Sequence, residues 1–393
     1  MFSKRIEVLS PSLTIEISTL ARELKASGKD ILSFSAGEPD FDTPSKIKEA
    51  AIDAINQGFT RYTAVAGIPE LLSAISDKLE RENGLKYDTS EILVSNGAKQ
   101  SLFNITQALL DEGDEVIIPA PYWVTYPELV KYAGAKPVIV ETNERNGFKI
   151  TAQELEEAIT PNTKMLILTS PSNPTGSIYT KEELERLAKV LEGTDIWVIS
   201  DEMYEKLVFD DAKFVSVASI SDDMFKRTIT VNGLSKSVAM TGWRMGYLAS
   251  SNKELVKKMI SLQSQSTSNI NSITQKASIV ALDGSVDEDI EKMRQAFEAR
   301  AKEAVKLFNA IDGISVLKPK GAFYLFVNIK DISMDSMQFC KDLLQDYGVA
   351  VVPGVGFGSE GYFRFSFATD ITTIREGIRR IEKFVKKLGR KES

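Results

Sequence analysis

Short apolar runs alternate with amphipathic helical segments through the middle of the chain. The pattern predicts helices between several of the runs, for example at 101–111 and 181–192. Alternation of strand and helix is typical of a mostly parallel sheet that is covered by helices on both faces. The predicted strands are 92–95, 115–119, 136–140, 165–169, 196–200, 228–231 and 245–249.

The pattern changes after residue 252. Two long helices, 253–281 and 286–310, are predicted there, and strands 323–327 and 363–367 then frame a helix at 336–347. A last helix begins near 371, and an N-terminal helix at 13–26 is expected to pack with this part of the chain. We therefore expect an α/β fold with a large domain at 45–284 and a smaller α+β domain built from 1–44 and 285–393.

The chain contains no histidine and a single cysteine, Cys340. The absence of histidine excludes Ser-His-Asp and Cys-His catalysis as well as histidine-ligated zinc, and no metal site is expected. Acid–base chemistry must then come from Lys, Tyr, Asp or Glu side chains whose pKa the fold has shifted. One cysteine forms no internal disulfide, so we expect a cytoplasmic protein.

Charge and hydropathy narrow the classes of partner. The 48 basic and 55 acidic residues give a net charge of −7, and the chain has no basic arm of the kind that binds nucleic acid. An apolar run of about 18 residues, the length needed to span a membrane, is also missing. We expect neither nucleic acid nor a membrane as a partner.

Polar residues follow the predicted strands, at the edge where parallel sheets bind ligands. Asn96-Gly97-Ala98-Lys99 opens a helix, and small residues there allow backbone N–H groups to approach a phosphate. An ordinary turn explains the small residues equally well. Lys99 is unfavourable in the first turn of a helix unless an anion lies opposite, so it indicates an acidic ligand.

Three further strand ends carry candidate residues. The stiff turn after 165–169 would hold the amide of Asn173, and Asp201 and Tyr204 after 196–200 would face one pocket. After 228–231, Lys236 lies in a segment with little other charge, which predicts a desolvated amine with a lowered pKa. Each residue alone has an ordinary structural explanation, and their coincidence at successive strand ends favours a site.

One glycine motif is excluded by its context. Residues 356–361 match the GxGxxG string, but they lead into the strand at 363–367 and not into a helix. A dinucleotide-binding turn requires the helix, so we interpret this segment as a flexible loop.

The motifs together resemble a known family. Asn173-Pro174-Thr175-Gly176, Asp201, Tyr204, Ser235-Lys236, Gly242-Trp243-Arg244 and Arg364 resemble, in order and spacing, the fold type I pyridoxal-phosphate aminotransferases. The segment from Ala36 to Phe41, Tyr62, the segment from Asn96 to Gln100, and Pro121-Tyr122-Trp123 resemble the class I bacterial aspartate aminotransferases. The resemblance also suggests cis peptide bonds at Ala120-Pro121 and Asn173-Pro174.

The resemblance implies a role for each cofactor-binding residue. Lys236 would hold pyridoxal 5'-phosphate as a Schiff base and shuttle the substrate proton, while Asp201 would pair with the pyridinium nitrogen. Asn173 and Tyr204 would hydrogen-bond the phenolate oxygen, and Trp123 would stack on the ring. The phosphate would be held by Ala98, Lys99, Ser235, Arg244 and, from a partner subunit, Tyr62, which implies a homodimer.

The substrate residues follow from the same resemblance. Arg364 would bind the α-carboxylate bidentately, with Gly37 adding a backbone contact and with Trp123 and Asn173 alongside. One subgroup uses a partner arginine for the distal carboxylate, but the stretch 259–275 contains none. Lys99 matches the other subgroup, in which a lysine after the phosphate turn takes that role.

We therefore expect a ping-pong transfer of the amino group from aspartate to 2-oxoglutarate. Prephenate is a secondary alternative, because neutral Ser10 precedes Pro11-Ser12 where prephenate enzymes tend to have a basic residue. Aromatic amino acids are another alternative substrate, since a pocket that contains Trp123 and Tyr62 would admit an aromatic ring. A C–S or β-lyase of the same fold and a non-catalytic binding module remain as rivals.

Overall fold

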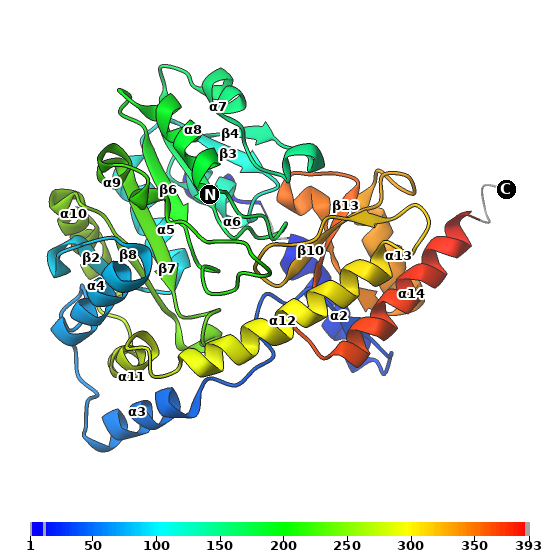
Figure 1. Ribbon diagram of the computed structural model, residues 1–393, viewed down its shortest axis with the longest axis horizontal. Helices are drawn as coiled ribbons and strands as arrows, with labels where there is room; N and C mark the ends of the chain where they lie inside the picture. Colours follow the sequence, from blue (N-terminus) through cyan, green and yellow to red (C-terminus); the bar gives the residue numbers. More distant parts are fainter. Residues whose placement is uncertain (1, 11–12, 390–393) are drawn as a thin grey trace.

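The computed structural model describes residues 2–10 and 13–389, and its centre is a seven-stranded sheet in the order β2-β8-β7-β6-β5-β3-β4 (Figure 1). β8 runs antiparallel to β2 and β7, and the remaining neighbours pair in parallel. The expected mostly parallel α/β fold is thereby confirmed. The strands are β2 Ile92–Asn96, β3 Glu115–Ala120, β4 Lys136–Glu141, β5 Thr163–Thr169, β6 Trp197–Asp201, β7 Thr228–Gly233 and β8 Met245–Ala249.

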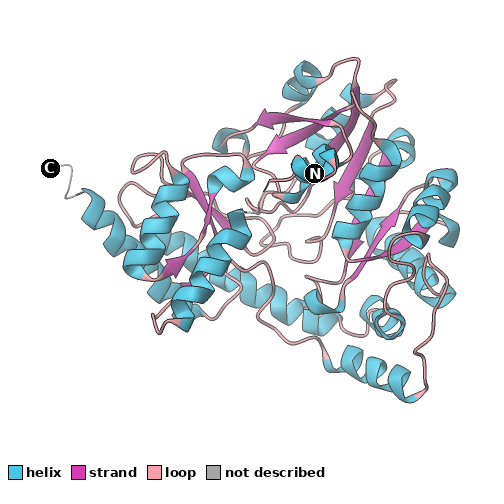
Figure 2. Cartoon of the chain, turned by 180° about the vertical axis from the view of Figure 1, so that it is seen from behind, coloured by secondary structure: helices cyan, strands magenta, loops and turns pink. Residues whose placement is uncertain are grey.

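Both faces of this sheet are buried. Successive residues of one strand enter different apolar clusters: Leu166 packs on one face, Ile167 on the other. Apolar residues without a polar alternation are expected when helices cover both sides, as Figure 2 shows. The surrounding helices are α4 Pro69–Asn83, α5 Ala98–Leu109, α6 Thr125–Tyr132, α7 Ala152–Ala158, α8 Lys181–Leu191, α9 Asp222–Arg227, α10 Lys253–Ser264 and α11 Ser272–Leu282.

A second, antiparallel sheet of order β12-β13-β10-β9 lies beside the first, with α12, α13 and α14 around it (Figure 1). The N-terminal segment belongs to the same part of the molecule, because β1 and β11 form a separate two-stranded parallel sheet and Ile17 of α2 packs with Leu344 and Ala350. Its elements are α2 Leu13–Ala26, β1 Leu32–Ser33, α12 Asp287–Phe308, β9 Ser315–Val316, β10 Tyr324–Asn328, α13 Ser336–Tyr347, β11 Val349–Ala350, β12 Val352–Pro353, β13 Tyr362–Ser366 and α14 Ile371–Gly389. Two helices, α1 Lys4–Glu7 and α3 Ser45–Asn56, lie outside both sheets. The domain limits 45–284 and 1–44 with 285–393 stay a prediction.

The single helix predicted at 253–281 is wrong. The structure has two helices, α10 and α11, and residues 265–271 between them are not helical. This break is rich in Ser, Thr and Asn, whose side chains compete for backbone hydrogen bonds. Ser268 adopts a φ of 61°, and the Asn271 side chain accepts a hydrogen bond from the Thr274 N–H to cap α11.

Other local predictions agree with the structure. Both expected peptide bonds, Ala120-Pro121 and Asn173-Pro174, are cis, and Ser170-Pro171 is a third. The interpretation of 356–361 as a loop is only partly right, because the segment includes the end of the 3-10 helix Gly354–Phe357 and the Phe357 carbonyl accepts a hydrogen bond from the Tyr122 N–H. It is followed by β13, so the dinucleotide-turn interpretation stays excluded.

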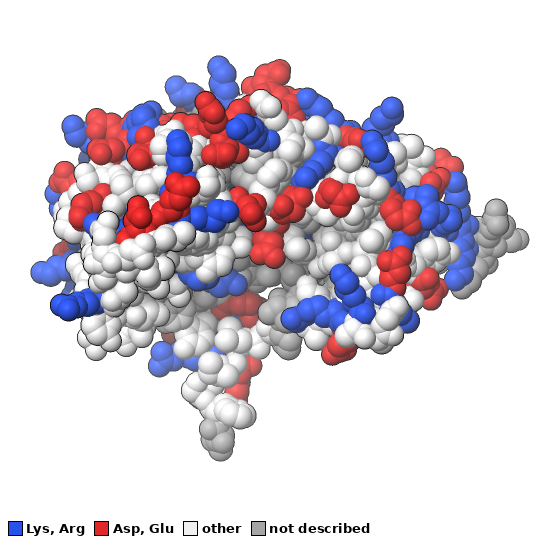
Figure 3. All heavy atoms as spheres, turned by 90° about the horizontal axis from the view of Figure 1, so that it is seen from below, with Lys and Arg blue, Asp and Glu red and all other residues white. Residues whose placement is uncertain are grey.

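The surface carries both signs of charge. On the face drawn in Figure 3, basic and acidic side chains are interspersed without a broad field of one sign. Over residues 2–10 and 13–389, every helix is too short or too polar to serve as a membrane span.

Candidate active site

A cavity of about 1250 Å³ opens where β2, β5, β6 and β7 end. The structure brings almost all of the predicted site residues to it, from both sheets and from the N-terminal segment. Tyr62 is the exception, because it does not line this cavity and its side chain is 91% exposed. The predicted residues that line the cavity are Gly37, Ala98, Lys99, Trp123, Asn173, Asp201, Tyr204, Ser235, Lys236, Arg244 and Arg364.

Lys236 lies between the two sheets, three residues beyond the end of β7. Its Nζ donates a hydrogen bond to the Gly37 carbonyl and lies 5.8 Å from the centre of the Phe323 ring. Burial, aided by the Arg364 and Arg244 charges, lowers the pKa of Lys236 to about 8, against the opposing effect of Glu38 and Asp201. Close to neutral pH the amine is therefore partly deprotonated and nucleophilic, as the sequence predicted.

Asp201 ends β6 at the floor of the cavity and is buried. Its Oδ2 accepts a 2.7 Å hydrogen bond from the Tyr126 hydroxyl, and its Oδ1 accepts one of 3.2 Å from the Met203 N–H. Burial raises the pKa of Asp201, although both hydrogen bonds and the Lys236 charge oppose that rise. Such a carboxyl group favours a cationic partner in the cavity.

Tyr204 and Asn173 approach the cavity from the turns after β6 and β5. The hydroxyls of Tyr204 and Tyr324 are hydrogen-bonded at 2.9 Å, and burial raises the pKa of Tyr204 well above its ordinary value. The Asn173 Oδ1 accepts a 3.0 Å bond from Arg364 Nη1, which leaves the Asn173 NH₂ to donate elsewhere. Both side chains thus present neutral hydrogen-bonding groups.

Arg364, in the middle of β13, is 4% exposed. Its guanidinium carbon lies 4.4 Å from the centre of the Tyr324 ring and 5.0 Å from that of Phe357, and Nη2 donates to the Ser35 carbonyl at 2.9 Å. Burial lowers its pKa, yet a guanidinium stays protonated at any working pH. Its buried Nε has no hydrogen-bond partner among the described residues, so the site offers a donor that suits a carboxylate.

The opposite end of the cavity suits an anion. Ala98 and Lys99 are the first residues of α5, so their backbone N–H groups have no acceptor within the helix. Ser235 and Arg244 line the same end, and a Cβ on Gly97 would lie 2.4 Å from Arg244 Nη2. The absent side chain therefore makes room for the guanidinium beside the helix terminus.

Lys99 extends from this helix toward the aromatic wall. Its Nζ lies 5.0 Å from the centre of the Trp123 ring, and burial together with the Arg244 charge lowers its pKa. No carboxylate pairs with Lys99 among the described residues. The ammonium is therefore free to meet an acidic ligand.

These groups fit pyridoxal phosphate. The helix terminus with Ser235 and Arg244 matches a phosphate, Asp201 a pyridinium nitrogen, and Lys236 an aldehyde. No cluster of three or more Cys, Asp or Glu side chains that would hold a metal occurs within residues 2–10 and 13–389.

Sequence reasoning missed three groups at the site. Tyr126 binds Asp201 directly, Tyr324 binds Tyr204 and packs on Arg364, and Glu38 lines the cavity near Lys236. Tyr126 is in the first turn of α6, directly after the motif Pro121-Tyr122-Trp123. Its position next to that motif was the one sequence signal that could have identified it as a site residue. Tyr324 lies in a strand with no motif, and only the packing of the two sheets reveals it.

Comparison with known proteins agrees with this geometry. Residues 29–381 match the family described as aminotransferase class I and II. An aspartate aminotransferase of Bacillus subtilis (strain 168) is 47% identical over 390 residues, 98% of this chain and 99% of that protein. An aspartate/prephenate aminotransferase of Cereibacter sphaeroides (strain ATCC 17029 / ATH 2.4.9) is 48% identical over 387 residues, 96% of each.

A solved structure shows the same arrangement. The aspartate aminotransferase of Thermus thermophilus with maleate superposes with a TM-score of 0.94 at 42% identity, covering 98% of this chain and 99% of that one. The family match spans most of the sequence and the similarity extends over nearly the whole fold. The chain belongs to the class I and II aminotransferases.

Proposed function

We propose that this aminotransferase moves the amino group of aspartate to 2-oxoglutarate with pyridoxal phosphate as its cofactor. The observation that carries the proposal is the meeting of Lys236, Asp201 and Arg364 in one cavity, with Lys99 at its other side. The similar enzymes named as aspartate aminotransferases, and the one solved with the dicarboxylate maleate, support the choice of an acidic substrate.

When bound, the cofactor supplies an aldehyde for the amine and a ring that accepts electrons from the substrate Cα. Lys236 would hold the cofactor and then move the proton at Cα, a task suited to an amine with a pKa near 8. Asp201 would keep the ring nitrogen protonated. Asn173 and Tyr204 would donate to the ring oxygen, and Trp123 would pack on the ring.

Substrate recognition rests on two cations. Arg364 would bind the α-carboxylate through the buried donor that lacks a partner, next to Gly37. Lys99 would bind the distal carboxylate of aspartate or 2-oxoglutarate, which a substrate such as alanine lacks. The subgroup that uses this lysine therefore remains our prediction for the chain.

We also propose a homodimer located in the cytoplasm. Tyr62 is exposed and lies outside the cavity of its own chain. A second subunit that presented its Tyr62 to the phosphate would complete the phosphate site with a side chain that has no place in the cavity of its own chain.

Borohydride reduction of the cofactor-loaded protein, followed by peptide mass mapping, tests the proposal. The added mass is expected on Lys236, and Lys236→Ala should lose turnover of aspartate while its circular dichroism spectrum is unchanged. Lys213→Ala, a variant of a lysine outside the cavity, is the control. Cofactor attached to another lysine, or an active Lys236→Ala enzyme, would refute the proposal.

A second candidate substrate is prephenate, because a relative of 48% identity is named for both substrates. Ser10 lines the cavity entrance and donates its N–H to Glu128 at 2.8 Å, while Pro11 and Ser12 lie outside the described residues. A neutral residue at the entrance favours aspartate. Assays with prephenate, phenylalanine and a β-substituted amino acid, the last monitored for pyruvate, separate this candidate from the aromatic and lyase alternatives.

A further inference from the structure

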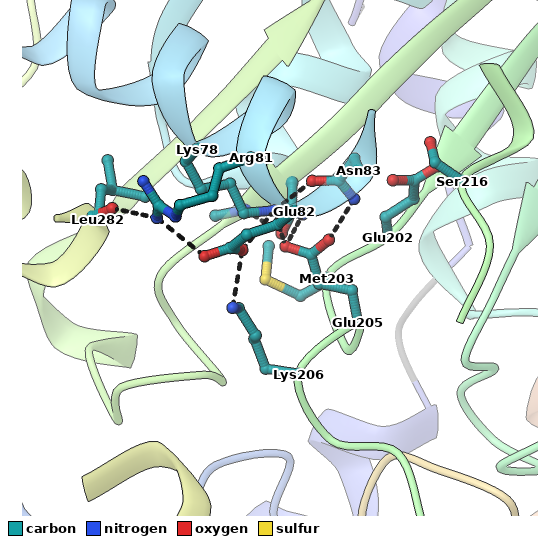
Figure 4. A network of polar contacts seen from close by, with 12 residues as sticks. Lys78, Arg81, Glu82, Asn83, Glu202, Met203, Glu205, Lys206, Ser216 and Leu282 are labelled. Atoms are coloured by element: carbon teal, nitrogen blue, oxygen red, sulfur yellow. Dashed lines mark hydrogen bonds and ion pairs between the residues drawn. The ribbon is translucent and has the colours of Figure 1, made fainter. Parts of the chain in front are cut away.

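A buried ion pair lies behind the site, between α4 and the loop after β6. Lys78 of α4 binds Glu205, and the side chains of the two residues are 4% and 7% exposed. Asn83 closes the contact: its Oδ1 accepts from Lys78 Nζ at 2.8 Å, and its Nδ2 donates to Glu205 Oε2 at 2.7 Å. Figure 4 shows these three side chains facing one another, with Glu82 and Lys206 beside them.

Glu205 also binds the next strand. The Asn232 Nδ2 donates to Glu205 Oε1 at 2.8 Å, and the Asn232 Oδ1 accepts from the Gly233 N–H at 2.7 Å. Asn232 is the second-last residue of β7, and Lys236 lies four positions after it along the chain. Glu205 itself comes immediately after Tyr204 in the β6 loop. The carboxylate therefore joins the loop that carries Asp201 and Tyr204 to the segment that carries Lys236.

Stability alone explains this pair poorly. Removing two charges from water costs about as much as their attraction returns, so apolar side chains of similar size would serve as well. Glu82, which lies 3.5 Å from Lys78, has partners of its own in Lys206 at 2.7 Å and Arg81 at 2.9 Å, so Lys78 and Glu205 remain each other's main charge partner. What an apolar pair would lack is the directional bond to Asn232.

We propose that Glu205, held by Lys78 and Asn83, is a positioning residue that sets the placement of Lys236 relative to Asp201 and Tyr204 through Asn232. The inference rests on the role proposed above for Lys236. It assigns a function to a cluster that touches neither substrate nor cofactor.

Two variants break the link at different points. Glu205→Ala removes the acceptor for Asn232 together with the charge, and Asn232→Ala leaves the Lys78–Glu205 pair intact, so it remains informative if the first variant fails to fold. Glu82→Gln is the matched control, because Glu82 also contacts Lys78 but has no bond to Asn232 among the described residues. The readout is the pKa of Lys236 in cofactor-free protein, measured by pH-dependent competitive acetylation and mass spectrometry.

In both variants Lys236 should gain water, and its pKa should rise by about one unit toward the ordinary lysine value. kcat should fall about tenfold or more with a smaller change in KM, because Arg364 and Lys99 are untouched. Glu82→Gln should change neither quantity. Folded variants with a lower melting temperature but an unchanged Lys236 pKa and kcat would overturn the inference. Failure of the function proposed above would instead appear in the unmodified enzyme, as cofactor trapped on another lysine.

Discussion

Tyr126 supports the ionised form of Asp201. Its hydroxyl donates to Asp201 Oδ2 at 2.7 Å and also lies 2.6 Å from the Thr169 hydroxyl. A donor to a carboxylate stabilises the charged form, so this bond offsets part of the burial that raises the Asp201 pKa. A residue that no motif marks thus supports the negative charge of Asp201, the residue that we propose pairs with the cofactor ring nitrogen.

Tyr126→Phe should raise the Asp201 pKa further and weaken its hold on a protonated ring nitrogen. A charge-assisted hydrogen bond contributes about 1 to 3 kcal/mol, so we expect kcat to fall roughly 10- to 100-fold. Steady-state kinetics and fluorescence titration with pyridoxal phosphate measure both effects. Tyr132→Phe, on the same helix, is the control, and equal losses in the two variants would contradict the prediction.

Lys99 should distinguish acidic from neutral substrates. Lys99→Ala removes the cation that lies beside the Trp123 ring. The transition-state stabilisation measured by kcat/KM should therefore fall by about 1 to 3 kcal/mol for aspartate and by far less for alanine. Lys131→Ala is a matched control, because Lys131 also lines the cavity but pairs with Glu128 at 2.9 Å. Equal losses for aspartate and alanine would instead assign Lys99 to the phosphate.

At the scale of single elements, the start of α5 depends on Gly97. Its φ is +81°, which disfavours other residues, and a Cβ would meet the Arg244 guanidinium. The backbone of Arg244 is in the left-handed region, with a φ of 58°. Its Nη1 donates a hydrogen bond to the Thr241 carbonyl at 2.8 Å. The helix terminus and the arginine therefore share one limited space.

Gly97→Ala should weaken cofactor binding as well as stability. The backbone conformation of Gly97, with φ 81° and ψ 159°, costs other residues about 1 to 3 kcal/mol, while displacement of Arg244 should lower the affinity for pyridoxal phosphate about tenfold. Gly113→Ala separates the two effects, because Gly113 has a φ of +98° and no atom within 4 Å of its Cβ position. If both variants bind the cofactor as the unmodified protein does, Arg244 does not hold the phosphate.

At the scale of the whole molecule, Glu202 is a buried carboxylic acid that does not line the cavity and has no role in the proposed mechanism. It is buried, its Oε1 accepts from Ser200 and Ser216 at 2.8 and 2.6 Å, and its Oε2 has no partner among the described residues. Burial and the nearby Glu205 raise its pKa to about 7. The folded protein thus keeps a proton that the unfolded chain, with an ordinary glutamate pKa near 4.5, releases.

The sign of the pH dependence follows. Because the pKa of Glu202 is raised in the folded protein, its contribution to the free energy of unfolding is complete below pH about 4.5. That contribution is lost as the pH rises through about 7. Glu202→Gln removes this proton equilibrium, so the variant should gain stability relative to the unmodified protein between pH 5 and 8, by at most about 3 kcal/mol. Urea unfolding at several pH values measures it, and a difference independent of pH would be contrary to this prediction.

Much of the fold and site was predictable from local patterns. The strand-end motifs placed Asn173, Asp201 and Lys236, and each lines the cavity. The prediction of one helix over 253–281 was wrong because the apolar periodicity continues on both sides of a polar break. Periodicity does not reveal a capping hydrogen bond such as the one that the Asn271 side chain accepts. The predicted contact of the exposed Tyr62 with the phosphate of a second subunit stays a prediction.

The sequence by itself determined the α/β order of the central elements, the absence of histidine from any acid–base chemistry, and the strand ends whose polar residues line the cavity. Periodicity and turn chemistry act over a few residues, and the chain order records them directly. The tertiary structure alone decided which distant groups tune that chemistry. Arg364 binds Ser35 across 329 positions, and Lys78 meets Glu205 across 127. Such partners depend on how finished elements pack, which no local pattern encodes.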